Sequence, residues 1–297
     1  MNPAVMPRWK VWWLAARPKT LPAAAAPVVV GTAAALHSGV FRPAPALAAL
    51  LAALCLQIGS NLANDVFDFK KGADRGERLG PMRVTQAGLL PPGQVLAGMW
   101  VVFAVAAVLG LYLVLVGGWP IVAIGVLSIL TAIAYTGGPY PLGYHGLGDL
   151  LVFIFFGPVA VVGTYYVQAG GISPLAVWAS VPVGTLVVNI LVVNNLRDIE
   201  NDRAAGKNTL AVRLGVRGTR VEYLLLLAIA LLVPLWLWLS GQTSAWVLVS
   251  WLALPVGWTP VRQVLTGQGR VLNHALAGSA RLALVYALLL AAGIWLG

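Results

Sequence analysis

A short segment in the first quarter of the chain carries amide and carboxylate side chains at helical spacing. Asn61, Asp65 and Asp68 recur at i, i+4 and i+7, and Asn64 lies beside them in the sequence. Residues at these spacings share one face of an α-helix. If the segment is helical, four oxygen-bearing side chains therefore lie close together.

A second segment repeats this arrangement, with Asn194, Asp198 and Asp202 at i, i+4 and i+8. Clustered carboxylates repel one another unless a cation holds them together. The available metal ligands are oxygen atoms only, because no thiolate or histidine lies at ligand spacing. This donor set favours magnesium over zinc. The four aspartates are also the candidate catalytic residues. The predicted Mg²⁺ ligands are Asn61, Asn64, Asp65, Asp68, Asn194, Asp198 and Asp202.

Basic residues are interspersed with both segments. Mg²⁺ usually binds one or two carboxylates together with substrate phosphates, so two such helices facing each other could hold metal ions that bridge a diphosphate. Charged residues beside a helix end often form only a solvated rim, but the matching period of the two segments favours a site. The predicted diphosphate-binding residues, which complement the charge of that group, are Lys70, Lys71, Arg83, Arg197 and Lys207.

The elements that must position these side chains are membrane helices. The 297 residues are 60% hydrophobic and only 9% charged, a composition that excludes a water-soluble domain of this size. The net charge of +10 is more typical of basic cytoplasmic loops than of nucleic-acid binding in so hydrophobic a chain. We therefore expect the lipid bilayer, and no nucleic acid, as a partner. The single cysteine, Cys55, excludes an intramolecular disulfide.

Apolar runs that could cross a bilayer recur along the whole chain. A hydrocarbon core about 30 Å thick needs about 20 apolar residues per helix. We predict one all-α membrane domain, residues 1–297, with nine transmembrane helices. The expected spans are 18–38, 44–66, 94–116, 119–136, 147–167, 174–196, 221–240, 244–262 and 276–296.

The basic residues are divided unequally between the connections. If the N-terminus is cytoplasmic, the even-numbered connections carry thirteen Lys and Arg residues and the odd-numbered ones carry only Arg42. Short loops rich in Lys and Arg stay in the cytoplasm, so we expect a multi-pass protein of the cell (inner) membrane with its N-terminus inside. The acidic residues fall on the same side. Because carboxylates contribute little to topology, this predicts that the site is cytoplasmic.

At these residues the sequence resembles the UbiA superfamily of intramembrane prenyltransferases. That family carries an Asn-Asp-x-x-Asp motif after its second helix and an Asp-x-x-x-Asp motif after its sixth. The corresponding segments are 64–68 and 198–202. Within the superfamily the chain is most similar to the menaquinone-pathway branch that uses 1,4-dihydroxy-2-naphthoate. The segments that carry this likeness are 17–22, 61–68, 80–88, 135–143 and 194–215.

The resemblance implies a fold and a reaction. The nine helices would surround a central cavity open to lipid, with helix–loop caps on the cytoplasmic side. A polyprenyl group would pass from polyprenyl diphosphate to 1,4-dihydroxy-2-naphthoate, with loss of carbon dioxide and diphosphate, to give demethylmenaquinone. Mg²⁺ would be the cofactor. Other branches have a third aspartate where this chain has Gly72. The menaquinone branch has a later aspartate, so the resemblance carries a metal role to Asp74.

Further side chains are candidates for binding the acceptor or stabilising an allyl cation. Tyr135 and Tyr140 flank a Gly-Gly-Pro turn and are preferred for this role. Arg17 and Lys19 could hold the acceptor carboxylate, although positive-inside anchoring explains both equally well. For the other aromatic candidates, helix packing or an interfacial belt is favoured over cation stabilisation. They are Phe153, Phe155, Phe156 and Tyr165.

Two other functions fit parts of the pattern. A related enzyme with another aromatic acceptor, such as 4-hydroxybenzoate or homogentisate, would use the same metal site. A transporter of an anionic metabolite would also place charges inside a helical bundle. Its charges should lie near mid-membrane on broken helices, whereas in this chain they are expected at one face.

Overall fold

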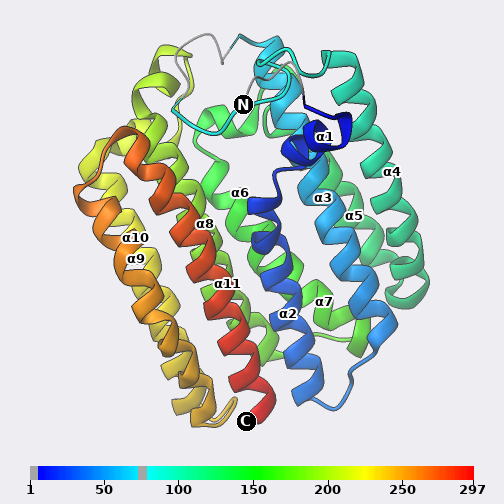
Figure 1. The fold of residues 1–297 in the computed structure, drawn as a ribbon. Coiled ribbons are helices and arrows are strands. Elements are labelled where there is room, and N and C mark those ends of the chain that lie inside the picture. Colours follow the sequence, from blue (N-terminus) through cyan, green and yellow to red (C-terminus); the bar gives the residue numbers. More distant parts are fainter. Residues whose placement is uncertain (1–5, 73–78) are drawn as a thin grey trace.

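The computed structural model describes residues 6–72 and 79–297. Within these residues the chain forms helices joined by short connections, without a strand. Figure 1 shows the helices side by side as one bundle. In chain order the elements are α1 (Arg8–Ala16), the 3₁₀ turn η2 (Pro18–Thr20), α2 (Leu21–His37), α3 (Pro43–Lys70), α4 (Pro92–Gly117), α5 (Trp119–Ala134), the 3₁₀ turn η3 (Leu142–His145), α6 (Gly148–Ile154), the π-helical segment η4 (Phe155–Val159), α7 (Ala160–Ala169), α8 (Pro174–Ala204), α9 (Leu210–Leu239), the 3₁₀ segment η5 (Ala245–Ala253), α10 (Leu254–Thr266), the 3₁₀ turn η6 (Gly269–Val271) and α11 (Leu272–Leu296).

The predicted all-α membrane fold is confirmed. In the described part of the chain, seven helical stretches are long and apolar enough to cross a membrane, and α5 is a shorter apolar helix of 16 residues. The span expected at 244–262 is divided between η5 and α10. Each expected span thus corresponds to a helix or to successive helices. The two chain ends lie at opposite ends of the bundle (Figure 1), as an odd number of crossings requires.

Proline marks the start of three long helices. Pro43, Pro92 and Pro174 occupy the first helical positions of α3, α4 and α8, each after a residue with extended backbone. The first N–H groups of a helix have no partner within it, so proline, which lacks this group and has a suitable fixed φ, is well tolerated there. These starts explain why the spans could be located from the sequence.

Two helices extend farther than expected. α3 has 28 residues and α8 has 31, which corresponds to lengths of about 42 and 46 Å, more than the hydrocarbon core requires. Their last turns carry Asp68 and Asp202. The polar stretch from 197 onward, expected as a cap, is therefore the end of α8 as far as Ala204. The next helix, α9, begins before its expected span and bends at Gly215, whose φ of 66° suits glycine.

The largest apolar core lies between α2, α8, α9 and α11. The Tyr286 hydroxyl of this core donates to the carbonyl of Ala230 (2.5 Å), and farther along α8 the Asn189 amide N–H donates to the carbonyl of Tyr223 of α9 (3.1 Å). Glycine permits close helix approach, since a Cβ at Gly31 of α2 would lie 2.4 Å from the Val161 carbonyl oxygen of α7. Such close packing stabilises helix pairs where there is little hydrophobic driving force.

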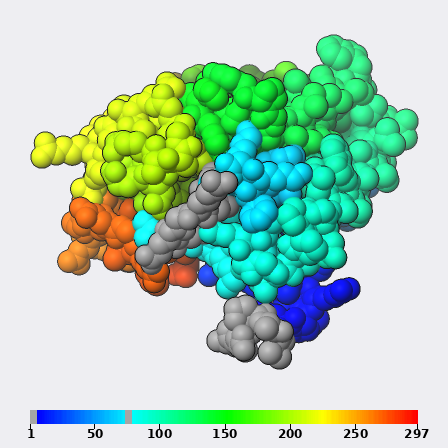
Figure 2. Space-filling model, turned by 90° about the horizontal axis from the view of Figure 1, so that it is seen from above, coloured from blue at the N-terminus to red at the C-terminus, as the bar shows by residue number. Residues whose placement is uncertain are grey.

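Three connections that are far apart in sequence meet at one end of the bundle. They are the α3–α4, α8–α9 and α10–α11 connections, which Figure 2 shows in cyan, yellow-green and orange. Asn273 of α11 donates to the Leu79 carbonyl (2.8 Å), and Lys207 of the α8–α9 connection lies 3.5 Å from Asp68 of α3. These contacts gather both predicted motif segments at the same end of the fold.

Candidate active site

A cavity of about 870 Å³ lies between the helices and combines a polar end with apolar walls. The apolar part is lined mainly by α4, α5, α7 and η4. Some of its lining side chains, such as Leu111 and Val126, are more than half exposed, so the cavity reaches the lateral surface of the bundle. Charged and amide residues from both motif segments line the polar end: Asn61, Asn64, Asp68, Asn194, Asp198 and Asp202.

Asp68 lies at the centre of the polar end. Its side chain is buried and forms a 2.5 Å ion pair with Arg83 from the α3–α4 connection. The Tyr144 hydroxyl donates to it at 2.5 Å, and the Lys207 ammonium lies 3.5 Å away. Arg83 and Lys207 also line the cavity. The structure thus brings one predicted metal ligand together with two of the predicted diphosphate-binding residues.

The second motif is organised by Arg197. Its buried guanidinium donates to both carboxylate oxygens of Asp198 (2.9 and 2.5 Å) and to the Asn194 side chain (2.9 Å). It also donates to the side chain of Asn273 on α11 (2.8 Å). Asp198 and Asn194 line the cavity, but Arg197 does not. Arg197 therefore lies behind the two residues and fixes their orientation.

Asp202 and Lys207 complete the polar end. Asp202 lies one turn beyond Asp198 on α8, lines the cavity and is 3.8 Å from the Lys207 ammonium. Lys207 also lies over the Tyr144 ring, 4.5 Å from its centroid. A single ammonium group therefore links the ends of α3 and α8, although these helices are joined by more than a hundred residues of intervening chain.

Asp65 differs from its neighbours. It is fully buried, does not line the cavity and accepts hydrogen bonds from the backbone N–H groups of Val84 and Thr85, both at 3.1 Å. The structure thus places this predicted metal ligand against the α3–α4 connection. Its proposed metal role stays a prediction.

The two asparagines of α3 connect the helix to its surroundings. Asn61 donates to the Ala16 carbonyl and to the Thr20 hydroxyl, both at 2.9 Å. Asn64 accepts a hydrogen bond from the Thr136 hydroxyl (3.0 Å). Asn61 therefore fixes the turn between α1 and α2.

That turn carries the two predicted acceptor-binding residues. Arg17 and Lys19 both line the cavity. Arg17 has a φ of 51°, a left-handed conformation that is uncommon for a residue other than glycine. The Thr20 hydroxyl and N–H both donate to the Arg17 carbonyl at 2.9 Å. The α1–α2 turn thus holds two cationic side chains at the edge of the polar end.

Comparison with known proteins decides the family. The UbiA prenyltransferase family matches residues 24–284. The chain belongs to the UbiA prenyltransferase family. It is 42% identical to the 1,4-dihydroxy-2-naphthoate octaprenyltransferase of Mycobacterium tuberculosis over 96% of this chain and 97% of that protein. It is 38% identical to the enzyme of the same name from Escherichia coli, over 97% and 96% of the two chains. The resemblance inferred from the motifs is confirmed.

Solved UbiA structures share the fold. A UbiA homologue from Aeropyrum pernix aligns with a TM-score of 0.71 and 21% identity over 94% of this chain and 98% of its own. A homologue from Archaeoglobus fulgidus, solved with DMAPP and Mg²⁺, aligns with a TM-score of 0.62 and 14% identity over 94% and 98% of the two chains. These structures show that the chain has the UbiA fold. The family match and the curated relatives show that it is a multi-pass membrane protein and an aromatic prenyltransferase.

Some of the predicted site residues lie outside the cavity. Lys70, Lys71 and Tyr140 do not line it. Lys71 donates to the Gly138 carbonyl (2.9 Å), and Tyr140 is exposed and stacks on His145 with ring centroids 3.6 Å apart. The roles assigned to these three residues stay predictions. Asp74 lies outside the described residues.

Two tyrosines have different positions around the polar end of this UbiA fold. Tyr135, which was predicted, lines the cavity. Tyr144 was not predicted, although it lines the cavity and contacts Asp68. The only sequence signal for it was its position in the conspicuous Gly- and Pro-rich loop that follows Tyr135.

Only part of the predicted aromatic set faces the cavity. The π-helical segment η4 contains Pro158 and directs Phe155 and Phe156 to the cavity lining. π-helical segments inside α-helices are frequent at functional sites. Phe153 packs instead against Gly184, and Tyr165 donates to the Ser38 hydroxyl at 3.3 Å. Phe153 and Tyr165 therefore have packing roles in this structure.

The donor set of the polar end fits magnesium chemically. Three carboxylates and three asparagine side chains of the two motif segments on α3 and α8 line one end of the same cavity, and oxygen donors of this kind suit Mg²⁺. Within the described residues no three acidic, His or Cys side chains converge as a ready-made metal cluster. Arg83, Lys207 and Arg197 neutralise the carboxylates instead. The site therefore pairs its acids with cations that can also bind phosphate.

Proposed function

We propose that the protein transfers a polyprenyl group from polyprenyl diphosphate to 1,4-dihydroxy-2-naphthoate, a step of menaquinone biosynthesis. The observation that carries this proposal is the similarity of nearly the whole chain to octaprenyltransferases that are named for this acceptor. The cavity supports it, because acidic and basic groups at one end suit a diphosphate and the apolar walls suit a polyprenyl chain.

The proposed metal ligands are the carboxylates that line the cavity, Asp68, Asp198 and Asp202, with Asn64 and Asn194 as further oxygen donors. When bound, Mg²⁺ supplies positive charge that stabilises the leaving diphosphate. The support comes from the donor chemistry and from the family member that was solved with DMAPP and Mg²⁺.

The basic residues contribute in two ways. Arg83 and Lys207 line the cavity beside Asp68, so we assign them to the diphosphate oxygens. Fixed cations aimed at the position where charge develops lower the barrier, because they need little rearrangement during the reaction. Arg197 is held by four side-chain hydrogen bonds behind Asp198 and Asn194. Its proposed role is to position those two ligands.

The carbon–oxygen bond of the allylic diphosphate breaks with its electron pair going to the diphosphate. The naphthoate ring supplies the electrons for the new carbon–carbon bond, and its carboxylate leaves as carbon dioxide. The ring keeps both hydroxyl groups, so the immediate product is the quinol form of demethylmenaquinone. We assign Arg17 and Lys19 to the acceptor carboxylate and the Tyr135 hydroxyl to hydrogen bonding in the cavity, which all three residues line.

The proposed orientation places the polar end of the cavity in the cytoplasm. Both motif segments lie at the end of the bundle that carries the N-terminus (Figure 1). The connections at that end carry most of the Lys and Arg residues. Short basic loops are retained on the cytoplasmic side of a membrane. Cysteine labelling from each side of intact vesicles at the exposed positions Ala87 and Ser38, in a variant without Cys55, tests this orientation. We expect Ala87→Cys to react from the cytoplasmic side and Ser38→Cys from the other side.

The decisive experiment measures prenyl transfer by the purified protein in lipid nanodiscs. A polyprenyl diphosphate and 1,4-dihydroxy-2-naphthoate are supplied with Mg²⁺ or with a chelator. Asp68→Asn and Asp198→Asn are compared with Glu200→Gln, a matched control whose carboxylate is exposed on α8 and pairs with Arg203. We expect Mg²⁺-dependent product with the wild type and the control and almost none with the other two variants.

Each other outcome overturns a defined part of the proposal. Consumption of the diphosphate only with 4-hydroxybenzoate or homogentisate would show that the acceptor is wrong but the site is right. Full activity of Asp68→Asn and Asp198→Asn would show that the site is wrong. Equal product in the presence of chelator would exclude a required Mg²⁺.

A further inference from the structure

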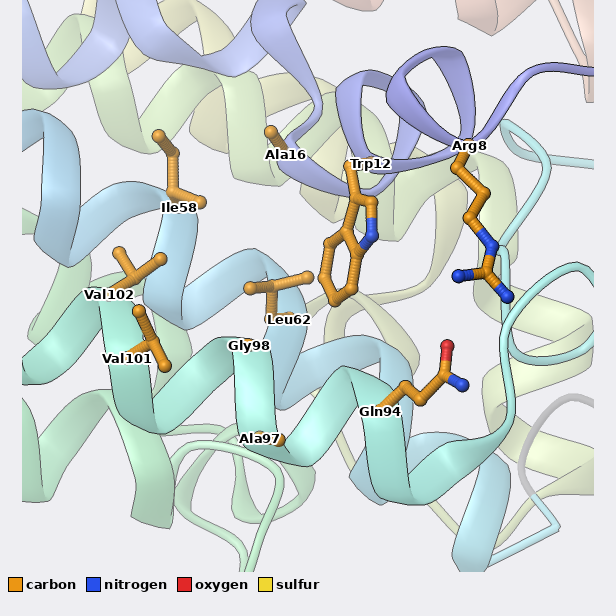
Figure 3. Close-up of a pocket in the computed structure, with 10 residues that line it drawn as sticks. All are labelled: Arg8, Trp12, Ala16, Ile58, Leu62, Gln94, Ala97, Gly98, Val101 and Val102. Atoms are coloured by element: carbon orange, nitrogen blue, oxygen red, sulfur yellow. The ribbon is translucent and has the colours of Figure 1, made fainter.

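A second hollow lies on the outer side of the bundle, between α1, α3 and α4. It has a volume of about 600 Å³ and is shown in Figure 3. We call it the α1 groove. Its lining is almost entirely apolar, with Trp12 from α1, Ile58 and Leu62 from α3, and Val101 and Val102 from α4. An apolar hollow of this size at the surface of a membrane protein faces lipid rather than water.

The α1 groove is separate from the active-site cavity. The two have no lining residue in common. On α3, Ile58 and Leu62 face the groove, whereas Asn61 and Asp68 face the cavity. One face of α3 thus lines the groove and another lines the cavity. A ligand can therefore occupy the groove without entering the active site.

The groove is polar at one end only. Figure 3 shows the side chains of Arg8 and Gln94 near each other at one end, with Ile58 and Val102 at the other. Arg8 is exposed. Among the described residues no carboxylate pairs with it. A single cation at one end of an apolar hollow matches a ligand that has one anionic head and a hydrocarbon tail.

The helix α1 forms one wall of the groove and packs tightly against α4. The Trp12 ring packs over Gly98 of α4 so closely that a Cβ at that position would lie 2.6 Å from it. On the same helix, Trp9 and Trp13 are 67% and 60% exposed. Exposed tryptophans of this kind are typical of the interface between lipid headgroups and hydrocarbon. These observations place α1, and the Arg8 end of the groove, at the depth of the lipid headgroups.

We propose that the α1 groove binds one anionic phospholipid, with its phosphate at Arg8 and Gln94 and an acyl chain along Leu62, Val101 and Val102. Charge complementarity decides the occupant, because basic pockets between helices on the cytoplasmic side attract anionic headgroups. Guanidinium groups pair well with phosphate oxygens. The acyl chain gains from every methylene that it buries against the apolar wall.

The lipid would also stabilise one edge of the active site. The groove contacts Ala16 at the end of α1. The carbonyl of the same residue accepts a hydrogen bond from Asn61, which lines the cavity. The next residue is Arg17, which also lines the cavity. A lipid in the groove would therefore hold the end of α1 in place. The α1–α2 turn that follows would then keep its cationic side chains at the cavity.

The test is lipid retention by the full-length protein. The purified protein is equilibrated with an equal mixture of phosphatidylglycerol and phosphatidylcholine and washed, and the lipid retained per chain is counted by native mass spectrometry. Arg8→Gln removes the cation, and Lys10→Gln, an exposed residue of the same helix outside the groove, is the matched control. Ala97→Phe fills the groove without changing charge, and Ala97 is exposed, so the larger side chain fits.

We expect one phosphatidylglycerol per wild-type and Lys10→Gln chain. Arg8→Gln should weaken its binding by about tenfold, the effect of losing one charged hydrogen bond, and Ala97→Phe should remove it. Equal retention of the two lipids, equal losses with Arg8→Gln and Lys10→Gln, or undiminished binding to Ala97→Phe would each overturn the proposal. So would displacement of the lipid by a polyprenyl diphosphate, which would make the groove a site for substrate. The readout does not depend on prenyl transfer, so it stands apart from the proposed activity.

Discussion

Asp65 and Asp68 lie one turn apart on α3, yet their carboxylates hold different parts of the same loop. Asp65 accepts the backbone N–H groups of Val84 and Thr85, and Asp68 pairs with the side chain of Arg83. One aspartate thus fixes the backbone of the loop and the other fixes its cationic side chain. Only Asp68 lines the cavity. In this structure the first motif therefore combines one carboxylate that holds the loop backbone with one that faces the cavity.

Asp65→Asn should destabilise the α3–α4 loop more than it weakens the binding of Mg²⁺ or diphosphate. The amide retains only one acceptor oxygen and turns an N–H group toward the backbone donors of Val84 and Thr85. We expect a loss of about 1–3 kcal/mol in the free energy of unfolding, as for a buried hydrogen bond left unpaired. Hydrogen exchange should show faster exchange at Val84 and Thr85. Asp68→Asn should leave that exchange slow while abolishing prenyl transfer, and identical exchange in both variants would contradict this division of roles.

Tyr144→Phe should reduce activity without unfolding the protein. It removes the hydroxyl that donates to Asp68 at 2.5 Å but keeps the ring beneath Lys207. The loss of one hydrogen bond to a charged group corresponds to about a tenfold decrease in kcat/KM. Tyr140→Phe is the matched control, because its ring is exposed and stacks on His145. Steady-state kinetics of the two variants should differ, and equal rates would remove Tyr144 from the site.

Arg197→Lys should raise the Mg²⁺ concentration needed for activity. A single ammonium group cannot reach Asp198, Asn194 and Asn273 together, as the guanidinium does. Loss of one or two charged hydrogen bonds predicts a decrease of about 10- to 100-fold in activity at limiting Mg²⁺. Arg203→Lys makes the same change at an exposed position of α8 and should have no effect. An unchanged Mg²⁺ titration for Arg197→Lys would show that Asp198 needs no such support.

Much of this arrangement followed from local pattern. The spacing of Asn194, Asp198 and Asp202 predicted a helix, and all three lie on α8 and line the cavity. Apolar run length predicted the membrane helices, because a bilayer imposes it on every span. The family motifs predicted the reaction class. These features depend on residues that are close together in the sequence, or on the solvent alone.

The remaining features depend on contacts between distant segments. Nothing near Asp65 in the sequence indicates that the α3–α4 connection folds back to donate two N–H groups to it. Arg197 was assigned to the diphosphate, but its acceptor Asn273 comes from α11 and holds it behind the cavity. Tyr144 reaches Asp68 from a separate loop. Side-chain direction at these positions is set by tertiary partners, which helical periodicity does not describe.

Gly31→Ala should destabilise the contact between α2 and α7. A Cβ at this position would lie 2.4 Å from the Val161 carbonyl oxygen and 2.9 Å from the Thr164 Cβ, so the two helices must separate. Overpacking of this kind costs about 1–3 kcal/mol. Gly93→Ala is the matched control, because a Cβ there meets nothing within 4 Å, and alanine is the better helix former. Thermal unfolding in detergent should show a lower Tm for Gly31→Ala only. Because Thr164 also lines the cavity, the same variant should bind polyprenyl diphosphate more weakly, and an unchanged Tm would show that the contact tolerates a methyl group.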